Sequence, residues 1–197
     1  FPCGSPLEST EGFEGLIEGN IAKAQALLKE SGYDGSPIVL LQASDTPALS
    51  NLSPVAKSIL ERIGFKVDMQ AMDWQSLVNR LLTKKGPPSE GGWNVFLTYW
   101  SMADLFDPLM TPFLQANCEK SRAGWPCDEP MEKLRERYAL ATDAVERKAI
   151  AVEVQKHQAK IVTHVHLGEG FNVTAMRKNV TGWINSPVIV FWGIDKQ

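Results

Sequence analysis

The chain has 197 residues, 44% of them hydrophobic and 22% charged, with a formal net charge of -3. This is enough for one large globular domain, or for a domain with a small appendage. Lys and Arg are scattered and the apolar runs are short, which argues against a nucleic-acid-binding surface and a membrane-spanning segment.

Residues 20–43 predict a helix followed by a buried strand. Asn20 is placed to cap a helix over residues 21–31, and Gly32 stands where a glycine commonly ends one. Residues 36–43, SPIVLLQA, form a short continuous apolar run, which is typical of a strand buried on both faces.

A second helix and a second strand follow. Ser53 and Pro54 suit the N-cap and the first position of a helix that runs to Ile63, and Gly64 ends it. Residues 65–72, FKVDMQAM, alternate between apolar and polar side chains, which predicts a half-exposed strand.

A third helix and strand complete the first half. Asp73 is placed to cap a helix over residues 74–85, and a linker-like stretch leads to an aromatic strand over residues 93–100, WNVFLTYW. Alternating helices and strands are typical of right-handed crossovers onto a parallel sheet. The predicted fold class is α/β, with a mixed, largely parallel sheet flanked by helices.

The second half is mainly helical. Pro130 suits the first position of a helix over residues 131–142, and Asp143 with Glu146 forms a capping box for a helix over residues 144–162. Strands or extended crossings are predicted for residues 163–169, 171–177 and 187–194.

Two acids, Asp104 and Asp107, lie in an apolar window without a basic residue, residues 97–113. The window begins in the strand over residues 93–100 and continues beyond the carboxyl end of that strand. In open α/β sheets, ligands bind outside the carboxyl ends of the strands. Asp107 is best explained as the N-cap of a helix over residues 108–116. Asp104 has no such role. It is either a solvated loop acid or the partner of a cation on a ligand.

The neighbours of Asp104 share its position at the end of the strand. Ser101 and Met102 belong to the loop that we expect to face a ligand. Trp100 either walls the pocket or belongs to the core, since an aromatic side chain at a strand end suits both roles.

Cys118 and Cys127 enclose a loop rich in turn-forming residues, EKSRAGWP. A disulfide across this loop is favoured over two free thiols, and it would indicate an oxidising compartment. Cys3 is left over, either free or paired with something outside this chain. The cysteines do not fit a zinc site, because no CxxC pair occurs and the histidines lie well downstream.

His164 and His166 lie two residues apart, so on a strand they would point to the same face. No third ligand is visible beside them, which favours a surface or hinge pair over a metal site. The sequence shows no nucleophile with a recognisable base. An enzyme is therefore disfavoured, and no catalytic residue, metal or cofactor is predicted.

Seven segments, in this order and spacing, resemble the extracellular solute-binding proteins of ABC importers in the peptide, dipeptide and nickel class, known as family 5. The segments are FPCGSPLES, AKAQALLKESGYDG, ILERIGFKVDMQAMDW, GGWNVFLTYW, ADLFDP, RKAIAVEVQ and NVTGWINSPVIVFWGIDK. Each is weak alone, but together they are specific and run along nearly the whole chain.

Members of that family look like two lobes that close on a ligand, and this chain resembles only the later lobe, of the type II periplasmic-binding-protein fold. The resemblance implies a ligand-binding lobe over residues 1–168 and a return segment toward the hinge and the first lobe over residues 169–197. It also implies a periplasmic or cell-surface-anchored protein. Because the chain opens at Phe1 rather than Met, we expect a mature or excised segment.

The resemblance further implies the solute-binding component of an ABC importer, which binds a peptide or a similar ammonium-bearing solute between two lobes and delivers it to the membrane permease. In peptide-binding relatives, an aspartate four residues before the proline of the ADLFDP motif receives the α-ammonium group of the ligand. Asp104 stands four residues before Pro108. The run between Trp100 and Asp104 is one residue longer than in some relatives, which leaves the ligand class open.

The alternative is a metal or metal-chelate carrier, or an enzyme that reuses the lobe. Only His164 and His166 support it.

Overall fold

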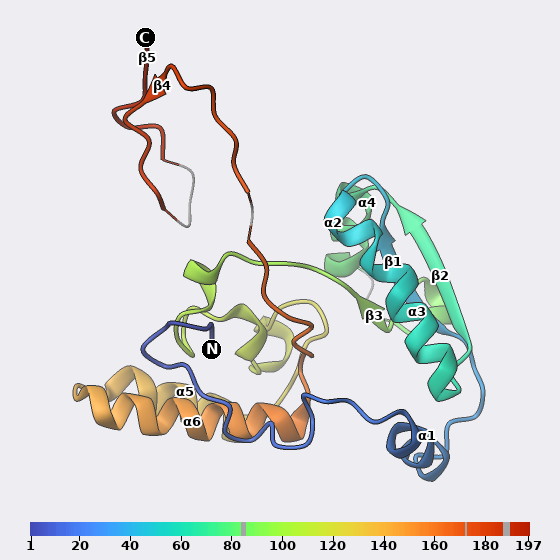
Figure 1. Ribbon diagram of the computed structural model, residues 1–197. Helices are drawn as coiled ribbons and strands as arrows, with labels where there is room; N and C mark the ends of the chain where they lie inside the picture. Colours follow the sequence, from blue (N-terminus) through green and yellow to red (C-terminus); the bar gives the residue numbers. More distant parts are fainter. Residues whose placement is uncertain (84–85, 172, 187–189) are drawn as a thin grey trace. The chain divides into compact units, whose positions relative to one another are not determined.

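The computed structural model describes residues 1–83, 86–171, 173–186 and 190–197, and these fall into two compact units (Figure 1). Unit 1 consists of Phe1–Gly12, Trp100–Cys118 and Pro126–Gln197. Unit 2 consists of Phe13–Tyr99 and Glu119–Trp125.

Unit 2 is built on a three-stranded sheet of β1 (Ile38–Ala43), β2 (Val67–Met72) and β3 (Val95–Phe96). The strand order is β2-β1-β3, and β1 pairs in parallel with both neighbours. Val39, Leu40 and Leu41 of the central strand are at most 4% exposed although they point alternately to opposite faces. The predicted parallel sheet and its doubly buried first strand are confirmed.

Helices α2 (Pro47–Ser50) and α3 (Leu52–Ile63) connect β1 to β2, and α4 (Trp74–Thr83) follows β2 (Figure 1). Helix α1 (Ile21–Glu30) precedes β1 and contacts α3. Leu77 and Leu81 of α4 join one apolar cluster with Val39 and Leu41 of β1. These two leucines lie four residues apart, on the same side of the helix. The helical spacing of apolar residues in this segment therefore builds the core of unit 2.

The predicted N-caps of α1 and α4 are confirmed. The Asn20 side-chain oxygen accepts a hydrogen bond from the Lys23 backbone N–H at 2.8 Å. The Asp73 carboxylate accepts one from the Ser76 backbone N–H at 2.9 Å. Both contacts satisfy donors that a helix leaves unpaired in its first turn. The last two residues predicted for α4, 84 and 85, lie outside the described residues.

The predicted start of α3, at Pro54, is wrong. The helix begins at Leu52 with Asn51 at its N-cap, after the separate short helix α2. Pro54 therefore lies inside the first turn, where its missing N–H has no intrahelical acceptor to lose. Ser53 is buried within the helix instead of capping it, and its hydroxyl donates to the Leu49 carbonyl at 3.4 Å.

The strand predicted over residues 93–100 is much shorter in the structure, since β3 contains only Val95–Phe96. Its pairing with β1 ends at Phe96, opposite Leu41. The aromatic and β-branched residues favour an extended chain. A strand also needs backbone pairing with a neighbouring strand, and here that pairing covers only two residues.

Unit 1 is built on two helices, α5 (Glu129–Leu140) and α6 (Ala144–Ile161), which lie side by side (Figure 1). They share an apolar cluster with the amino-terminal segment and with the turn before the first cysteine of the loop. The buried members of this cluster are Leu7, Leu114, Ala116, Met131, Tyr138, Ala141, Ile150, Ala151 and Val154. Segments far apart in the sequence therefore meet in one core.

Asp143 caps α6 as predicted, whereas the predicted start of α5 is wrong. The Asp143 carboxylate accepts hydrogen bonds from the backbone N–H groups of Val145 and Glu146, both at 2.9 Å. Helix α5 begins earlier than predicted, at Glu129, because Asp128 serves as its N-cap and accepts from the Met131 N–H at 2.8 Å. Pro130 lies in the first turn, as its missing N–H allows.

The last part of unit 1 has little regular structure. Residues 163–171 form no strand, so the extended crossing is the better description there. Two short strands, β4 (Val180–Thr181) and β5 (Asp195–Lys196), pair antiparallel. Residues 187–189 of the predicted last strand lie outside the described residues, and residues 190–194 lead into β5 through a turn.

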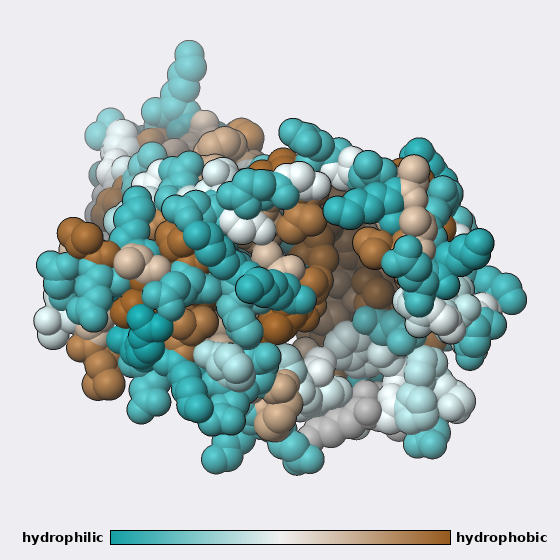
Figure 2. Space-filling model, turned by 90° about the horizontal axis from the view of Figure 1, so that it is seen from below, coloured by the Kyte–Doolittle hydropathy of each residue, from teal (hydrophilic) through white to brown (hydrophobic). Residues whose placement is uncertain are grey.

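Hydrophilic side chains cover much of the face drawn in Figure 2, with apolar ones between them. On α5 and α6, exposed ion pairs join Lys133 to Glu129 and Arg137 to Glu153. Within the described part of the chain, none of the helices combines the length and the apolar character that crossing a bilayer requires.

Candidate ligand-binding site

The predicted ligand-binding residues all lie at the start of the segment Trp100–Cys118, within unit 1. Asp104 belongs to the 3-10 turn η2 (Met102–Leu105). Its backbone N–H donates to the Ser101 carbonyl at 3.0 Å, whereas its side chain is exposed. Among the described residues, the Asp104 carboxylate has no hydrogen-bond or ion-pair partner. The backbone of Asp104 is therefore held in the turn, while its carboxylate is free to bind a ligand.

Asp107 has a structural role, as its position predicts. Its carboxylate accepts hydrogen bonds from the backbone N–H groups of Leu109 and Met110, both at 2.8 Å. Its carbonyl accepts from the Thr111 N–H at 3.0 Å and from the Thr111 hydroxyl at 2.8 Å. The capping role is confirmed: the Asp107 carboxylate binds backbone groups, whereas that of Asp104 has no partner among the described residues.

The α-helix predicted after Asp107, over residues 108–116, is wrong. The structure has a turn there, followed by the short 3-10 turn η3 (Pro112–Leu114). Pro112 disfavours a helical conformation at the residue before it, and it has no N–H to continue a helical ladder. Asp107 therefore caps a tight turn.

Ser101 and Met102 behave differently from one another. The Ser101 hydroxyl accepts a hydrogen bond from the Ala103 backbone N–H at 3.3 Å, so it caps the turn that carries Asp104. The Met102 side chain is 38% exposed and provides apolar surface beside that turn. Contact of either residue with a ligand stays a prediction.

Trp100 begins a row of rings that contact one another. It meets Phe113 edge to face, with ring centroids 5.6 Å apart. Phe113 in turn contacts His164, with centroids 5.4 Å apart. Trp100 is half-buried, so its ring packs on one side and retains some exposed surface. Both roles considered for Trp100, pocket wall and core, are compatible with this position.

The two histidines lie together, as their spacing predicts. The Nε2 atoms of His164 and His166 are 3.1 Å apart, and His164 Nδ1 lies 3.0 Å from the Thr163 hydroxyl. Burial lowers the pKa of His164 from 6.5 to about 4, and the neighbouring His166 adds to the effect. Within the part of the chain that the structure describes, no three His, Cys, Asp or Glu side chains gather as metal ligands would.

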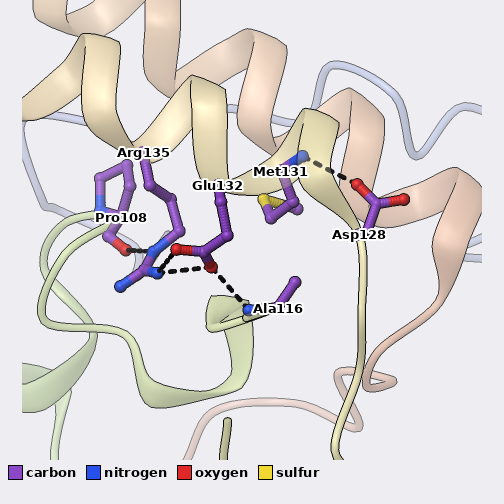
Figure 3. A network of polar contacts seen from close by, with 6 residues as sticks. All are labelled: Pro108, Ala116, Asp128, Met131, Glu132 and Arg135. Atoms are coloured by element: carbon purple, nitrogen blue, oxygen red, sulfur yellow. Dashed lines mark hydrogen bonds and ion pairs between the residues drawn. The ribbon is translucent and has the colours of Figure 1, made fainter. Parts of the chain in front are cut away.

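A partly buried polar network connects the segment after Asp104 to α5 (Figure 3). Arg135 Nε donates to the Pro108 carbonyl at 3.0 Å. Arg135 Nη1 contacts both carboxylate oxygens of Glu132 at 2.7 Å, and Glu132 Oε1 accepts from the Ala116 backbone N–H at 2.6 Å. Sequence reasoning missed this pair. An acid and a base three residues apart on a helix are a common surface pattern, so their spacing gave no sign of partners elsewhere in the chain.

A second connection joins the end of the segment to α5. The Asp128 backbone N–H donates to the Ala116 carbonyl at 2.9 Å. His157 Nε2 lies 2.7 Å from the Asp128 carboxylate, so this histidine, for which the sequence predicts no role, supports the N-cap of α5. Burial opposes ionisation of Asp128, but its contacts with the Met131 N–H and His157 outweigh it, so the pKa of Asp128 is lowered.

The predicted disulfide between Cys118 and Cys127 is confirmed. The Cys118 backbone N–H donates to the Pro126 carbonyl at 3.0 Å, and Asn117 forms a bridge with Cys127. The covalent bond therefore closes a loop that the backbone already brings together. Cys3 is an exposed free cysteine.

The fold and the segment after β3 define the class: a lobe of the type II periplasmic-binding-protein fold, with a parallel sheet flanked by helices. Residues 2–125 match the model of the bacterial extracellular solute-binding proteins, family 5 Middle. The chain belongs to this family, as the sequence motifs indicate. An extracellular family agrees with the predicted location outside the cytoplasm and with the disulfide.

Two curated relatives are similar along most of the chain. The "Probable peptide ABC transporter periplasmic-binding protein y4tO" of Sinorhizobium fredii is 36% identical over 178 residues, which are 90% of this chain and 33% of that protein. "Di/tripeptide-binding protein 2" of Pseudomonas aeruginosa is 27% identical over 177 residues, 84% of this chain and 31% of that protein. The chain therefore spans about a third of the length of these relatives.

Solved structures of the same fold include the dipeptide-binding protein of Pseudoalteromonas sp. SM9913 in complex with Met-Leu. Its TM-score with this chain is 0.67 at 16% identity, and the matched region comprises all of this chain and 39% of that protein. NikA of Staphylococcus aureus in complex with Ni(L-His)2 has a TM-score of 0.66 at 16% identity, over 90% of this chain and 38% of its own. At such low identity, these similarities establish the fold alone.

Proposed function

We propose that this protein binds peptides or similar ammonium-bearing solutes as the solute-binding component of an ABC importer, without catalysing a reaction. In this proposal, residues 1–168 form the ligand-binding lobe and residues 169–197 return toward the first lobe. The ligand is enclosed between the two lobes and delivered to the membrane permease. The names of the two curated relatives support a peptide as the ligand.

One observation carries the proposal: the exposed Asp104 carboxylate, held on a capped turn, has no partner among the described residues. Because Asp107 supplies the capping for the following turn, Asp104 remains available for a ligand. An ammonium group enclosed with a carboxylate makes charge-assisted hydrogen bonds of about 1.5–3 kcal/mol. In open water the same pair contributes about 0–1 kcal/mol. Enclosure between two lobes would therefore turn Asp104 into a selective ammonium receptor.

The test is calorimetric titration of the complete gene product with the tripeptide Ala-Leu-Ala. Asp104→Asn removes the charge and keeps the shape, and we expect it to weaken binding by about 10- to 100-fold. The free energy of unfolding should change by less than about 0.5 kcal/mol, since the side chain is exposed. Glu30→Gln, an exposed acid at the end of α1, is the matched control and should bind like the wild type. Equal affinity of Asp104→Asn and the wild type would refute the proposal.

A further inference from the structure

The Asp104 segment has few hydrogen bonds to regular secondary structure, so its shape depends on side chains from elsewhere. Between residues 101 and 116 the chain forms only short 3-10 turns, η2 and η3. Two of its backbone groups are bound by α5: the Pro108 carbonyl by Arg135, and the Ala116 N–H by Glu132 (Figure 3). These two contacts hold positions eight residues apart in the segment.

Most of the Arg135 side chain is buried. Its side chain is 11% exposed, and Glu132, its partner, is 30% exposed. The guanidinium donates to a carbonyl through Nε and to a carboxylate through Nη1, which uses its planar, fixed arrangement of donors. The Pro108 carbonyl lies in a fully buried residue, where an unpaired acceptor would be costly. Arg135 therefore satisfies the Pro108 carbonyl and the Glu132 carboxylate at the same time.

The position of Pro108 fixes the turn around it. Asp107 and Thr111 are joined by two hydrogen bonds, and Asp107 also caps Leu109 and Met110, so residues 107–111 form one closed turn. The turn η2, which carries Asp104, ends two residues before Asp107. Burial raises the pKa of Tyr138 on α5, and the Asp107 carboxylate adds to the rise, in agreement with the closeness of this turn to the helix.

We propose that Arg135 is a positioning residue for the ligand: through the Pro108 carbonyl it holds the closed turn on α5, through Glu132 it supports the contact with Ala116 at the end of the segment, and so it directs the Asp104 carboxylate at the ammonium group. The inference rests on the proposed function. It adds a residue that touches neither the ligand nor Asp104 but determines how well an ammonium group is recognised.

The test compares the affinity of the complete gene product for Ala-Leu-Ala with that for its N-acetylated form. Acetylation removes the ammonium charge and adds an acetyl group. The acetyl group is the same for every variant, so a change in the ratio between variants reports the ammonium contact. In the wild type we expect a ratio of at least about tenfold. In Arg135→Met the ratio should fall to about threefold or less, because the carboxylate is no longer directed at the ammonium. A general loss of stability would weaken both peptides equally and leave the ratio unchanged.

Arg137→Met is the matched control. Arg137 lies on the same helix, is 54% exposed and pairs with Glu153, so its removal should keep the wild-type ratio. If Arg135→Met does not fold, Arg135→Lys replaces it, since lysine keeps the charge but lacks the planar, fixed arrangement of donors of the guanidinium. A reduced ratio is also expected for this variant.

The outcomes separate the two proposals. A wild type that does not prefer the free peptide contradicts the proposed function. A wild type that prefers it, with an unchanged ratio in the Arg135 variant, contradicts only the positioning role.

Discussion

The sheet of unit 2 and the Asp104 segment of unit 1 keep their shapes by different means. In the sheet, β1 is paired on both sides by backbone hydrogen bonds and covered by apolar side chains. In the segment, charged side chains take over this role: Asp107 caps the turn, and Arg135 with Glu132 binds its backbone. Hydrophobic burial is non-directional, whereas hydrogen bonds fix orientation. We therefore expect substitutions in the sheet to change stability and substitutions around the segment to change recognition.

The largest effect on stability should come from the core of the sheet. Leu77 is fully buried among the side chains of β1, so Leu77→Ala should lower the free energy of unfolding by about 2–5 kcal/mol through lost burial and a cavity. Leu82→Ala, on the same helix but 63% exposed, should change it by less than about 0.5 kcal/mol. Urea denaturation measures both. Equal effects of the two variants would contradict the assignment of the core.

The disulfide should have the next largest effect. Cys118 and Cys127 are nine residues apart, so losing their bond should cost about 2–3 kcal/mol by freeing the unfolded chain. Denaturation with and without dithiothreitol should show this loss in the wild type and in Cys3→Ser. Cys127→Ser should be insensitive to the reductant. A wild type that dithiothreitol does not destabilise would show that the bond does not form in solution.

A smaller effect should follow from His164. Since burial lowers its pKa from 6.5 to about 4, the folded state binds this proton less readily than the unfolded state does. Its contribution to stability is therefore complete above pH 6.5 and is lost as the pH falls toward about 4. Allowing for solvent screening, we expect a loss of about 1–3 kcal/mol.

Comparison with His164→Gln isolates this contribution from the titrating carboxylates. The difference in unfolding free energy between the wild type and His164→Gln should shift by that amount between pH 7 and pH 4.5, in favour of the variant at the lower pH. Parallel pH profiles of the two proteins would show that His164 titrates normally.

The smallest effect should distinguish the two acids of the segment. Asp107→Ala removes an acceptor for two backbone N–H groups and should cost about 1 kcal/mol of stability. Asp104→Ala should change stability by less than about 0.5 kcal/mol, because its side chain is exposed. Thermal unfolding of both variants measures the contrast. A larger loss for Asp104→Ala than for Asp107→Ala would mean that the roles are reversed.

Local features of this chain were predictable from its sequence. The caps at Asn20, Asp73 and Asp143 depend on contacts within three residues, and the burial of β1 depends on a continuous apolar run. The capping by Asp107 was also predictable, although the helix after it was not. Pro112 interrupts that helix.

Features set by distant partners were not predictable in the same way. The strand over residues 93–100 is cut to Val95–Phe96 because its length depends on β1, which is far away in the sequence. Arg135 binds Pro108, which is 27 residues away in the sequence, and Glu132 binds Ala116, which is 16 residues away. No local pattern marks such contacts. The sequence therefore indicated Asp104 as a candidate site residue but not Arg135 and Glu132, which bind the segment around it.

The most direct test of the central claim is a crystal structure of the complete gene product with bound Ala-Leu-Ala. The account predicts that the peptide ammonium nitrogen lies about 2.7–2.9 Å from a carboxylate oxygen of Asp104, with Arg135 still bound to the Pro108 carbonyl. An ammonium group bound by other residues, with Asp104 facing solvent, would contradict it.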